Sequence, residues 1–335
     1  MHKSCKELSC KETALSLSDY CWQHIPDKKA HVSRLKEDTK DKKSMKGFNL
    51  KGIHAHSIDL SRADLKGANL SNADFKGANF SDANLTDANL IGSDISECEF
   101  IGAECNRANF MMANLSKSRF WHADMKNADF AECNLQAADM LSASLAGSNL
   151  YHADLRDVKF LIKENFTGKG GKEYINEEGP KTARESYANL KQYFITAARF
   201  NDVSWASYNE SRMELRRLWK EKRAGVVPFL VMGLLCGWGE RPLRATVSAF
   251  SIITGYASVF YFSKAIYPTF SQTYQPTFLD MIYYSTITFT TVGYGDFLPR
   301  LDNPVYKFLA GSEAFIGIFM MGLFVFSLGR RYSTR

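Results

Sequence analysis

The chain of 335 residues lacks an apolar stretch at its N-terminus. It begins MHKSCKELSC, which has no apolar core of the kind that a secretory signal requires. We therefore expect the N-terminal part to stay in the cytosol. The sequence also lacks a disulfide framework, because its seven cysteines are odd in number and unevenly spaced. In a reducing compartment, clustered cysteines more often bind a metal than form disulfides.

The sequence also lacks the patterns of an enzyme active site, with no paired acid and base and no nucleophile motif. An enzyme is therefore the class of protein with the least support. The net charge is +6, but the basic residues flank apolar segments and do not form one patch with interleaved aromatic residues. We therefore expect no nucleic acid partner.

What is present divides the chain into two parts. Mean hydropathy is −0.26, which is typical of a soluble protein, but the average hides a sharp change along the chain. Residues 1–225 carry most of the charge, whereas residues 226–335 are rich in Phe, Ile, Met, Leu and Tyr. This change predicts a soluble part followed by a membrane part.

Residues 46–160 repeat with a period of five. A large residue falls on nearly every position divisible by five, and a small residue, usually alanine, lies two positions before it. A period of five fits neither a helix nor a strand, so the chain must turn a corner once per repeat. The large and small residues then point inward, and stacked coils bury them.

This A(D/N)LXX pattern resembles the pentapeptide-repeat family, which implies a right-handed quadrilateral β-helix over residues 46–160. The large residue is replaced at Ala55 and Cys105, and the small one at Phe48, Ile53, Ile58 and Val158. Some members of that family mimic DNA, which needs a strongly acidic surface. Here 15 acidic residues stand against 11 basic ones, which favours a rigid scaffold or assembly surface. Cys98 and Cys133 occupy small inward positions and are expected in the core.

The N-terminal segment, residues 1–45, contains a candidate metal site and then a charged linker over residues 25–45. Three cysteines and one histidine have the spacing C-x4-C-x10-C-x2-H, which suits tetrahedral zinc. The alternative is three free thiols and a surface histidine. The expected ligands are Cys5, Cys10, Cys21 and His24.

Residues 161–225 are predicted to form a loop and a helical hairpin that connect the two parts. The loop contains GKGGK, but it lacks the spacing of a phosphate-binding loop. Basic residues crowd the last helix directly before an apolar run, and we expect them to contact anionic lipid headgroups. They are Arg212, Arg216, Arg217, Lys220, Lys222 and Arg223.

The membrane part, residues 226–335, contains two apolar segments long enough to cross a bilayer, 246–263 and 305–329. Residues 226–238 are too short and read as an interfacial helix. Residues 277–290 are also short and read as a re-entrant pore helix. Basic residues lie before the first span and after the second, and only Lys264 and Arg300 lie between. Both termini are therefore expected in the cytoplasm, whereas a third span at 226–238 would place the repeat outside.

Between the pore helix and the second span lies FTTVGYGDFLP, residues 289–299. Non-helical backbone at membrane depth is tolerated where it lines a polar path. Gly293 and Gly295 allow backbone conformations that aim carbonyl groups at one axis. One chain offers too few oxygens to replace the water around an ion, but four chains around a cyclic axis offer rings of four.

TTVGYGD with one helix on either side resembles the pore of the two-transmembrane potassium channels, over residues 246–329. The resemblance implies an all-α pore domain, a homotetramer, permeant K⁺ and a gate on the inner helix. It implies a selectivity filter formed by Thr291, Val292, Gly293, Tyr294 and Gly295. It implies filter support from Tyr283, Tyr284, Thr290 and Asp296. Some members place a glutamate in the pore helix to pair with this aspartate, but here that position is Ile287.

The second span holds an ionisable residue and two candidate hinges. Glu313 is expected to support the back of the pore helix, because charged residues within spans usually face the protein interior. Gly317 and Gly322 are candidates for a gate hinge, although glycine in membrane helices often serves close packing. No arginine-rich voltage sensor is present, and no domain is expected after residue 335, so cytosolic control is expected from the N-terminal side.

The sequence thus predicts a potassium channel in the cell membrane whose cytosolic repeat domain regulates, assembles or tethers it. The alternative is a membrane-anchored interaction protein whose repeats bind a partner and whose pore-like tail does not conduct. An intact TVGYG argues against a mere anchor. Neither the gating stimulus nor the cytosolic partner follows from the sequence.

Overall fold

The computed structural model describes residues 3–7, 9–40, 44–167, 179–271, 273–300 and 303–333, with only the backbone for 331–333. The chain divides into two compact units, Met1–Glu214 and Leu215–Arg335. One continuous core runs through the first unit, and two smaller clusters form the core of the second.

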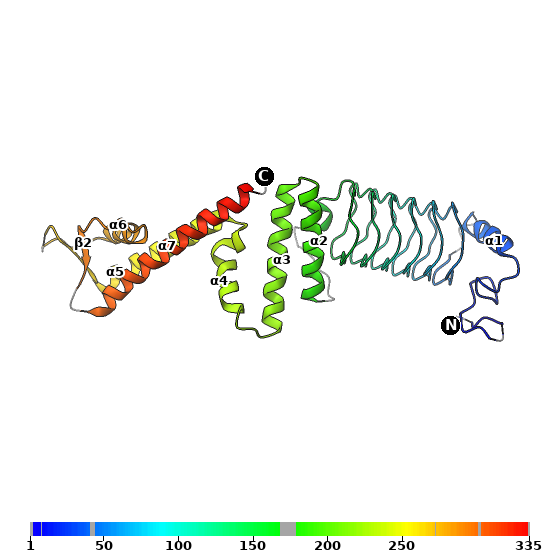
Figure 1. Ribbon diagram of the computed structural model, residues 1–335, viewed down its shortest axis with the longest axis horizontal. Coiled ribbons are helices and arrows are strands. Elements are labelled where there is room, and N and C mark those ends of the chain that lie inside the picture. The colour runs from blue at the N-terminus through cyan, green and yellow to red at the C-terminus, as the bar shows by residue number, and fades with distance from the viewer. Residues whose placement is uncertain are drawn as a thin grey trace. The chain divides into compact units, whose positions relative to one another are not determined.

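The first unit contains the predicted repeat as a stack of coils (Figure 1). Parallel bridges join residues that are 20 apart, from Asn49 with Asn69 to Asp139 with Lys159. Four pentapeptides therefore complete one turn of the coil. Backbone bonds such as that from Leu70 N to Asn89 O, 2.7 Å long, run from each coil to the next. Each bridge is one residue long, so the four sides are short segments between corners.

The corners explain why aspartate and asparagine recur in the repeat. The side chain of Asn79 accepts a hydrogen bond from the backbone N–H of Ser81 at 2.9 Å, and its counterparts in other coils do the same. This local bond fixes a turn. The second residue of each corner has a positive φ, for example 53° at Asn72 and 56° at Asp82. Short polar residues and glycine adopt this conformation most readily.

The interior of the coil is filled by the large residues of the repeat, stacked on their counterparts. Phe80, Phe100 and Phe120 form one stack, with ring centroids 5.0 and 4.9 Å apart. All three side chains are fully buried. Cys98 and Cys133 are buried as expected. Burial raises the pKa of Cys98 to about 12, so its thiol stays protonated and unreactive.

The inward series ends before its last predicted member. Phe160 is 55% exposed, whereas the neighbouring Leu161 is buried. The register changes because the chain leaves the coil here and enters the short helix η1, Lys163–Phe166. The prediction that Phe160 points inward is therefore wrong.

The N-terminal end of the coil is covered by helix α1, Lys28–Lys40. Its Leu35 is fully buried in the same cluster as Met45 and Leu50. The prediction of a linker is therefore wrong for residues 28–40. A mostly charged helix with few apolar residues gives a weak periodic signal, yet Leu35 and Val32 pack it against the core at the end of the coil.

The C-terminal end of the coil is covered by η1 and helix α2, Pro180–Thr196, followed by helix α3, Phe200–Lys220. Asn165 Nδ2 donates to the carbonyl oxygens of Met140 and Ala143, at 3.2 and 2.7 Å. The hydroxyl of Tyr193 donates to Val158 O at 2.9 Å. These bonds attach the covering segments to the last coils of the repeat. Residues 168–178 of the predicted connector loop lie outside the described residues.

The second unit contains α4 (Val226–Cys236), η2 (Gly237–Gly239), α5 (Pro242–Ser263), α6 (Phe278–Phe289) and α7 (Pro304–Ser333). Among the described residues, two helices are long and apolar enough to cross a membrane, at Pro242–Ser263 and Pro304–Arg330. Both correspond to predicted spans. The helix α4 is apolar but shorter, and α6 is the predicted pore helix by position (Figure 1).

The pore domain is not all-α as predicted. Strand β1, Ile266–Pro268, pairs antiparallel with strand β2, Phe297–Pro299. The chain that leaves α5 and the chain that follows the glycine-rich segment run side by side here and bond to one another. A strand of three residues has no detectable periodicity, so only the fold reveals it.

The turn between α4 and α5 is tied to the end of α7. The Arg330 guanidinium pairs with the Glu240 carboxylate at 3.0 Å and donates to Trp238 O at 3.0 Å. The Glu240 side chain is only 7% exposed. Gly239 has φ +87°, and a Cβ there would lie 2.7 Å from the Phe326 ring. Glycine is therefore required for this approach.

Candidate functional site

The start of α6 is fixed by its own sequence. The Thr277 hydroxyl accepts from the Asp280 backbone N–H at 3.3 Å, and the Asp280 carboxylate accepts from the Thr277 N–H at 2.7 Å. This reciprocal pair is a capping box, which satisfies two free N–H groups at the helix start. The Tyr274 hydroxyl donates to the same carboxylate at 2.8 Å. The capping box therefore fixes the residue at which α6 begins, and α6 ends directly before the glycine-rich segment.

The end of α6 leads directly into residues 291–295. The Val292 N–H donates to Ile287 O at 2.8 Å, which closes the last turn. The chain then takes positive φ at Thr291, Gly293 and Gly295, at 60°, 55° and 81°. A threonine in this region is uncommon and marks a constrained backbone. All five residues are exposed in the single chain.

The two adjacent tyrosines of α6 point in different directions. Tyr284 is buried and packs edge-on against Phe260 of α5, with centroids 5.4 Å apart. Tyr283 packs edge-on against Phe297 of β2, with ring centroids 6.2 Å apart. Tyr283 therefore joins α6 to the strand that follows TVGYG. Ile287 itself is buried.

Thr269 is a further contact that the sequence did not reveal. Its hydroxyl lies 3.1 Å from Gly295 O and 3.0 Å from Asp296 O, and its backbone N–H donates to Asp296 O at 2.8 Å. The β1–β2 pair brings this residue beside the end of the glycine-rich segment. No motif surrounds Thr269, so a single sequence contains no signal for it. The other predicted support residue, Thr290, bonds back within α6 to Thr286 O at 2.8 Å.

Glu313 is fully buried where α5, α6 and α7 meet. The Ser285 hydroxyl of α6 contacts the Glu313 carboxyl group and also lies 2.9 Å from Ile253 O of α5. Glu313 Oε2 has no hydrogen-bond partner among the described residues. The structure therefore places Glu313 behind the pore helix, and Ser285 joins it to the first span.

We expect Glu313→Gln to preserve channel activity and Glu313→Leu to lose most of it. A hydroxyl has one proton, so Ser285 cannot donate to both oxygens at once. A glutamine amide can donate to the hydroxyl oxygen and leave its proton for Ile253. Leucine leaves the hydroxyl with one partner fewer, at a cost of about 1–3 kcal/mol. Ion flux and thermal unfolding of both variants test this, and equal flux in both would show that Glu313 only fills space.

The two hinge candidates lie in different surroundings. A Cβ added at Gly317 would lie 1.8 Å from the carbonyl oxygen of Phe289, the last residue of α6. Glycine at 317 is therefore needed for the close approach of α7 and α6. A Cβ at Gly322 would meet no described atom within 4 Å. The structure gives Gly317 a packing role, and a hinge at Gly322 stays a prediction.

The four predicted metal ligands converge. Their ligand atoms all lie within 4.8 Å of one another. Cys10 Sγ is 3.7 Å from Cys21 Sγ, and His24 Nδ1 is 3.6 Å from Cys5 Sγ and 3.3 Å from Cys21 Sγ. In a tetrahedral zinc site with bonds of about 2.0–2.3 Å, ligand atoms lie about 3.5–3.8 Å apart. The donor set and its spacing fit a zinc ion.

The local electrostatics also suit a metal-binding thiolate. Desolvation raises the pKa of Cys5, but hydrogen bonds from the backbone of Cys21 and Glu7 outweigh it, and the pKa falls to about 7. The Cys21 N–H donates to Cys5 Sγ at 3.3 Å. A thiolate, not a thiol, is the form that binds a metal.

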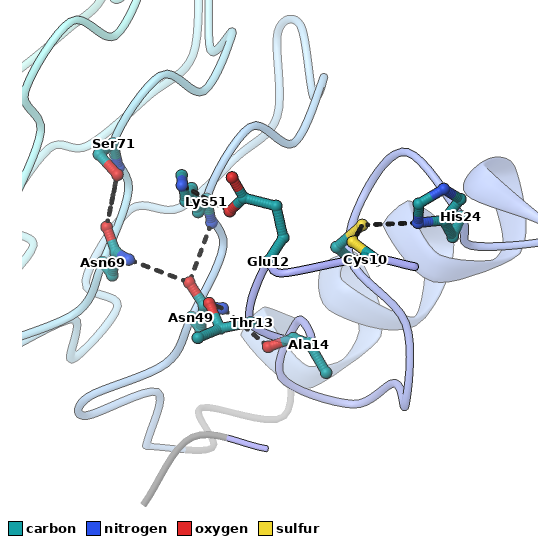
Figure 2. A network of polar contacts seen from close by, with 10 residues as sticks. Cys10, Glu12, Thr13, Ala14, His24, Asn49, Lys51, Asn69 and Ser71 are labelled. Atoms are coloured by element: carbon teal, nitrogen blue, oxygen red, sulfur yellow. Dashed lines mark hydrogen bonds and ion pairs between the residues drawn. The ribbon is translucent and has the colours of Figure 1, made fainter. Parts of the chain in front are cut away.

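The cysteine cluster is attached to the first coil of the repeat (Figure 2). Asn49 Nδ2 donates to Ala14 O at 2.7 Å and to Thr13 Oγ1 at 3.0 Å, and Lys51 pairs with Glu12. Figure 2 also shows Cys10 and His24 facing one another beyond this contact. The segment thus folds around its four candidate ligands and docks through side chains of the coil.

Comparison with protein families divides the chain in the same way. Residues 249–334 match the ion channel family. Residues 58–96 match eight copies of the pentapeptide repeat, and residues 93–164 match a pentapeptide repeat region. The chain therefore joins pentapeptide repeats to an ion channel domain of the two-helix type. With its two apolar helices, it is a membrane protein.

Solved structures similar to the chain are pentapeptide repeat proteins. Rfr23 from the cyanobacterium Cyanothece 51142 is 22% identical, covers 38% of this chain and 94% of its own, and has a TM-score of 0.27. HetL from Nostoc sp. strain PCC 7120, a protein involved in heterocyst differentiation regulation, is 24% identical, covers 40% and 67%, and has a TM-score of 0.16. No curated protein matches the chain.

Proposed function

We propose that the chain forms a homotetrameric, potassium-selective channel in the cell membrane, with both termini in the cytoplasm. The observation that carries the proposal is the segment TVGYG, which follows the end of α6 with all five residues exposed in the single chain and its glycines at positive φ. Four copies would arrange the carbonyl oxygens of residues 291–295 in rings that replace the hydration shell of K⁺.

The surroundings of the segment support this role. The C-terminal end of α6 carries a partial negative charge and would favour a cation below the filter. The Thr269 hydroxyl bonds to the carbonyl oxygens of Gly295 and Asp296, so the end of the segment is braced within each chain. Such bracing keeps carbonyl groups in place when a partly dehydrated ion binds them.

The exposed faces of the two long helices support assembly. Only 17% of the apolar window of α5 and 22% of that of α7 are buried in the single chain. Surfaces of this kind need lipid or neighbouring helices to cover them. Arg241 just before α5 and Arg244 in its first turn, against only Lys264 and Arg300 between the spans, support cytoplasmic termini.

The cytosolic part is proposed to be a right-handed quadrilateral β-helix with Zn²⁺ bound by Cys5, Cys10, Cys21 and His24. The coil of four pentapeptides and the convergence of the four ligand atoms support these two assignments. The repeat domain then regulates, assembles or tethers the channel, and its caps at both ends suit a rigid unit.

Flux of K⁺ and Na⁺ through the purified chain in liposomes tests the channel proposal. We expect K⁺ flux well above Na⁺ flux, and we expect Gly293→Ala to lose most K⁺ flux or its selectivity. Residue 293 has φ +55°, a conformation that costs a side chain about 1–2 kcal/mol in every subunit. Gly255→Ala, a helical site with no described atom near its Cβ, is the matched control.

A tetramer that carries no ion would instead support the alternative, a membrane-anchored interaction protein with a pore-like tail. Conduction of Na⁺ equal to that of K⁺ would contradict the selectivity but not the channel. Mass measurement of the intact assembly in the same preparation separates these outcomes from a failure to assemble.

A further inference from the structure

A second group of ligand-type side chains lies on the coil, outside the cysteine cluster. His54, His56 and Asp74 each offer one ligand atom, and these atoms lie within 4.8 Å of one another. His56 Nε2 contacts Asp74 Oδ2, and His54 Nδ1 lies 3.6 Å from the same oxygen. Two imidazole groups therefore converge on the same carboxylate oxygen.

The coil places these residues together by its repeat. His54 and Asp74 are partners in a parallel bridge between successive coils, so their side chains leave the same side of the coil one above the other. His54 occupies the position at which the repeat usually has aspartate or asparagine. His56 follows in the adjoining corner. A scaffold of stacked coils holds all three backbones at fixed separation, which reduces the entropy lost on binding.

Second contacts orient the donors. Asp74 Oδ1 accepts from the Lys76 backbone N–H at 3.3 Å, which fixes the carboxylate and leaves Oδ2 toward the histidines. The Lys76 amine pairs with Glu97 at 3.5 Å and so is drawn away from Asp74. Elsewhere on the coil, carboxylates such as Asp87 pair with arginine, which cannot ligate a cation. At Asp74 the side chains that contact the carboxylate are two imidazoles, which can ligate a cation.

Trp22 fixes the ring of His54. The two rings stack with centroids 5.7 Å apart and an angle of 27° between their planes. Trp22 lies between Cys21 and His24 in the sequence, so a folded cysteine cluster positions the ring that covers His54. Both imidazole groups remain more than half exposed, which leaves room for water to complete a coordination shell.

We propose that His54, His56 and Asp74 form a second metal site, which binds a divalent transition-metal ion and completes its shell with water. Two imidazole groups and one carboxylate select zinc, copper, nickel or cobalt, because magnesium and calcium prefer shells of oxygen alone. The site differs from the cysteine cluster because it is more exposed and contains no soft thiolate ligand. The proposal of this metal site does not depend on whether the protein conducts ions.

Titration of the full-length protein with Ni²⁺ tests this site. The protein carries an affinity tag without histidine, and its cysteine cluster is first loaded with one equivalent of Zn²⁺ per chain, after which weakly bound metal is removed by dialysis. Calorimetry is expected to show about one Ni²⁺ bound per chain. His54→Ala, His56→Ala and Asp74→Asn are each expected to remove this binding, because each deletes one of three protein ligands.

His122→Ala is the matched control, since His122 is an exposed histidine in a corner of another coil, and it should bind Ni²⁺ like the wild type. Zinc content of every variant checks that the N-terminal segment still folds. Binding that persists in the double variant His54→Ala/His56→Ala, or no binding in the wild type, would overturn the proposal.

Discussion

Gly317→Ala is expected to abolish K⁺ flux, whereas Gly311→Ala in the same helix leaves it close to wild type. A Cβ at 317 would lie 1.8 Å from the carbonyl oxygen of Phe289 and 2.7 Å from its carbonyl carbon, so it overlaps the backbone of α6. A clashing side chain could rotate away from the new methyl group, but the backbone of α6 at Phe289 cannot. Overpacking of a buried contact typically costs about 1–3 kcal/mol, and a tetramer repeats the cost four times. Liposome flux and the mass of the assembly measure the effect.

Gly322→Ala separates packing from hinge motion in the same helix. No described atom lies within 4 Å of a Cβ at 322, so packing alone predicts a conducting channel. A hinge at 322 predicts reduced open probability with normal assembly, because alanine stiffens a helix. If Gly317→Ala conducts like the wild type, the close contact between α6 and α7 is not part of the conducting state.

Cys21→Ser is expected to remove zinc from the protein and to unfold the N-terminal segment. Cys21 Sγ lies 3.7 Å from Cys10 Sγ and 3.3 Å from His24 Nδ1, so its replacement removes one of the four ligands and its contacts with two of the others. Structural zinc contributes about 10–16 kcal/mol of apparent binding energy in small domains, far more than the few apolar residues of this segment can replace. Metal analysis and limited proteolysis of residues 3–25 measure the outcome.

Cys133→Ala is the control for that experiment. Cys133 is buried in the coil, away from the cluster, and its replacement should leave the zinc content unchanged. Native protein that contains no zinc after metal-replete purification would refute the site, even though its ligand atoms converge. Zinc retained by Cys21→Ser at the wild-type level would show that the remaining donors suffice.

The fold could be predicted from the sequence wherever its periodicity was long. The period of five and the alternation of large and small residues predict a coil with inward Phe80, Phe100 and Phe120, because many units repeat the same signal. The ends could not be predicted in this way. The exposure of Phe160 and the burial of Leu35 depend on how the ends of the coil are covered. The repeat stops at these ends, so no repeated signal in the sequence predicts either one.

The contacts at the candidate sites likewise include some that the sequence predicts and others that only the fold reveals. The spacing of Cys5, Cys10, Cys21 and His24 predicts their convergence, because two close pairs of such ligands are typical of a tetrahedral zinc site. The contacts of Thr269 with Gly295 and Asp296 were missed, since only the β1–β2 pair brings these residues together. His54 and Asp74 are 20 apart, which has meaning only once the coil length is known.

The tie between Arg330 and the turn before α5 has a mechanical consequence. Arg330 forms an ion pair with the Glu240 carboxylate and donates a hydrogen bond to Trp238 O. Because Gly239 has no side chain, the Phe326 ring can pack beside them. The entrance of the first span and the exit of the second are therefore fastened to one another within each chain. A displacement of the segment that precedes α5 would therefore move the end of α7 through these contacts, without involving residues 291–295.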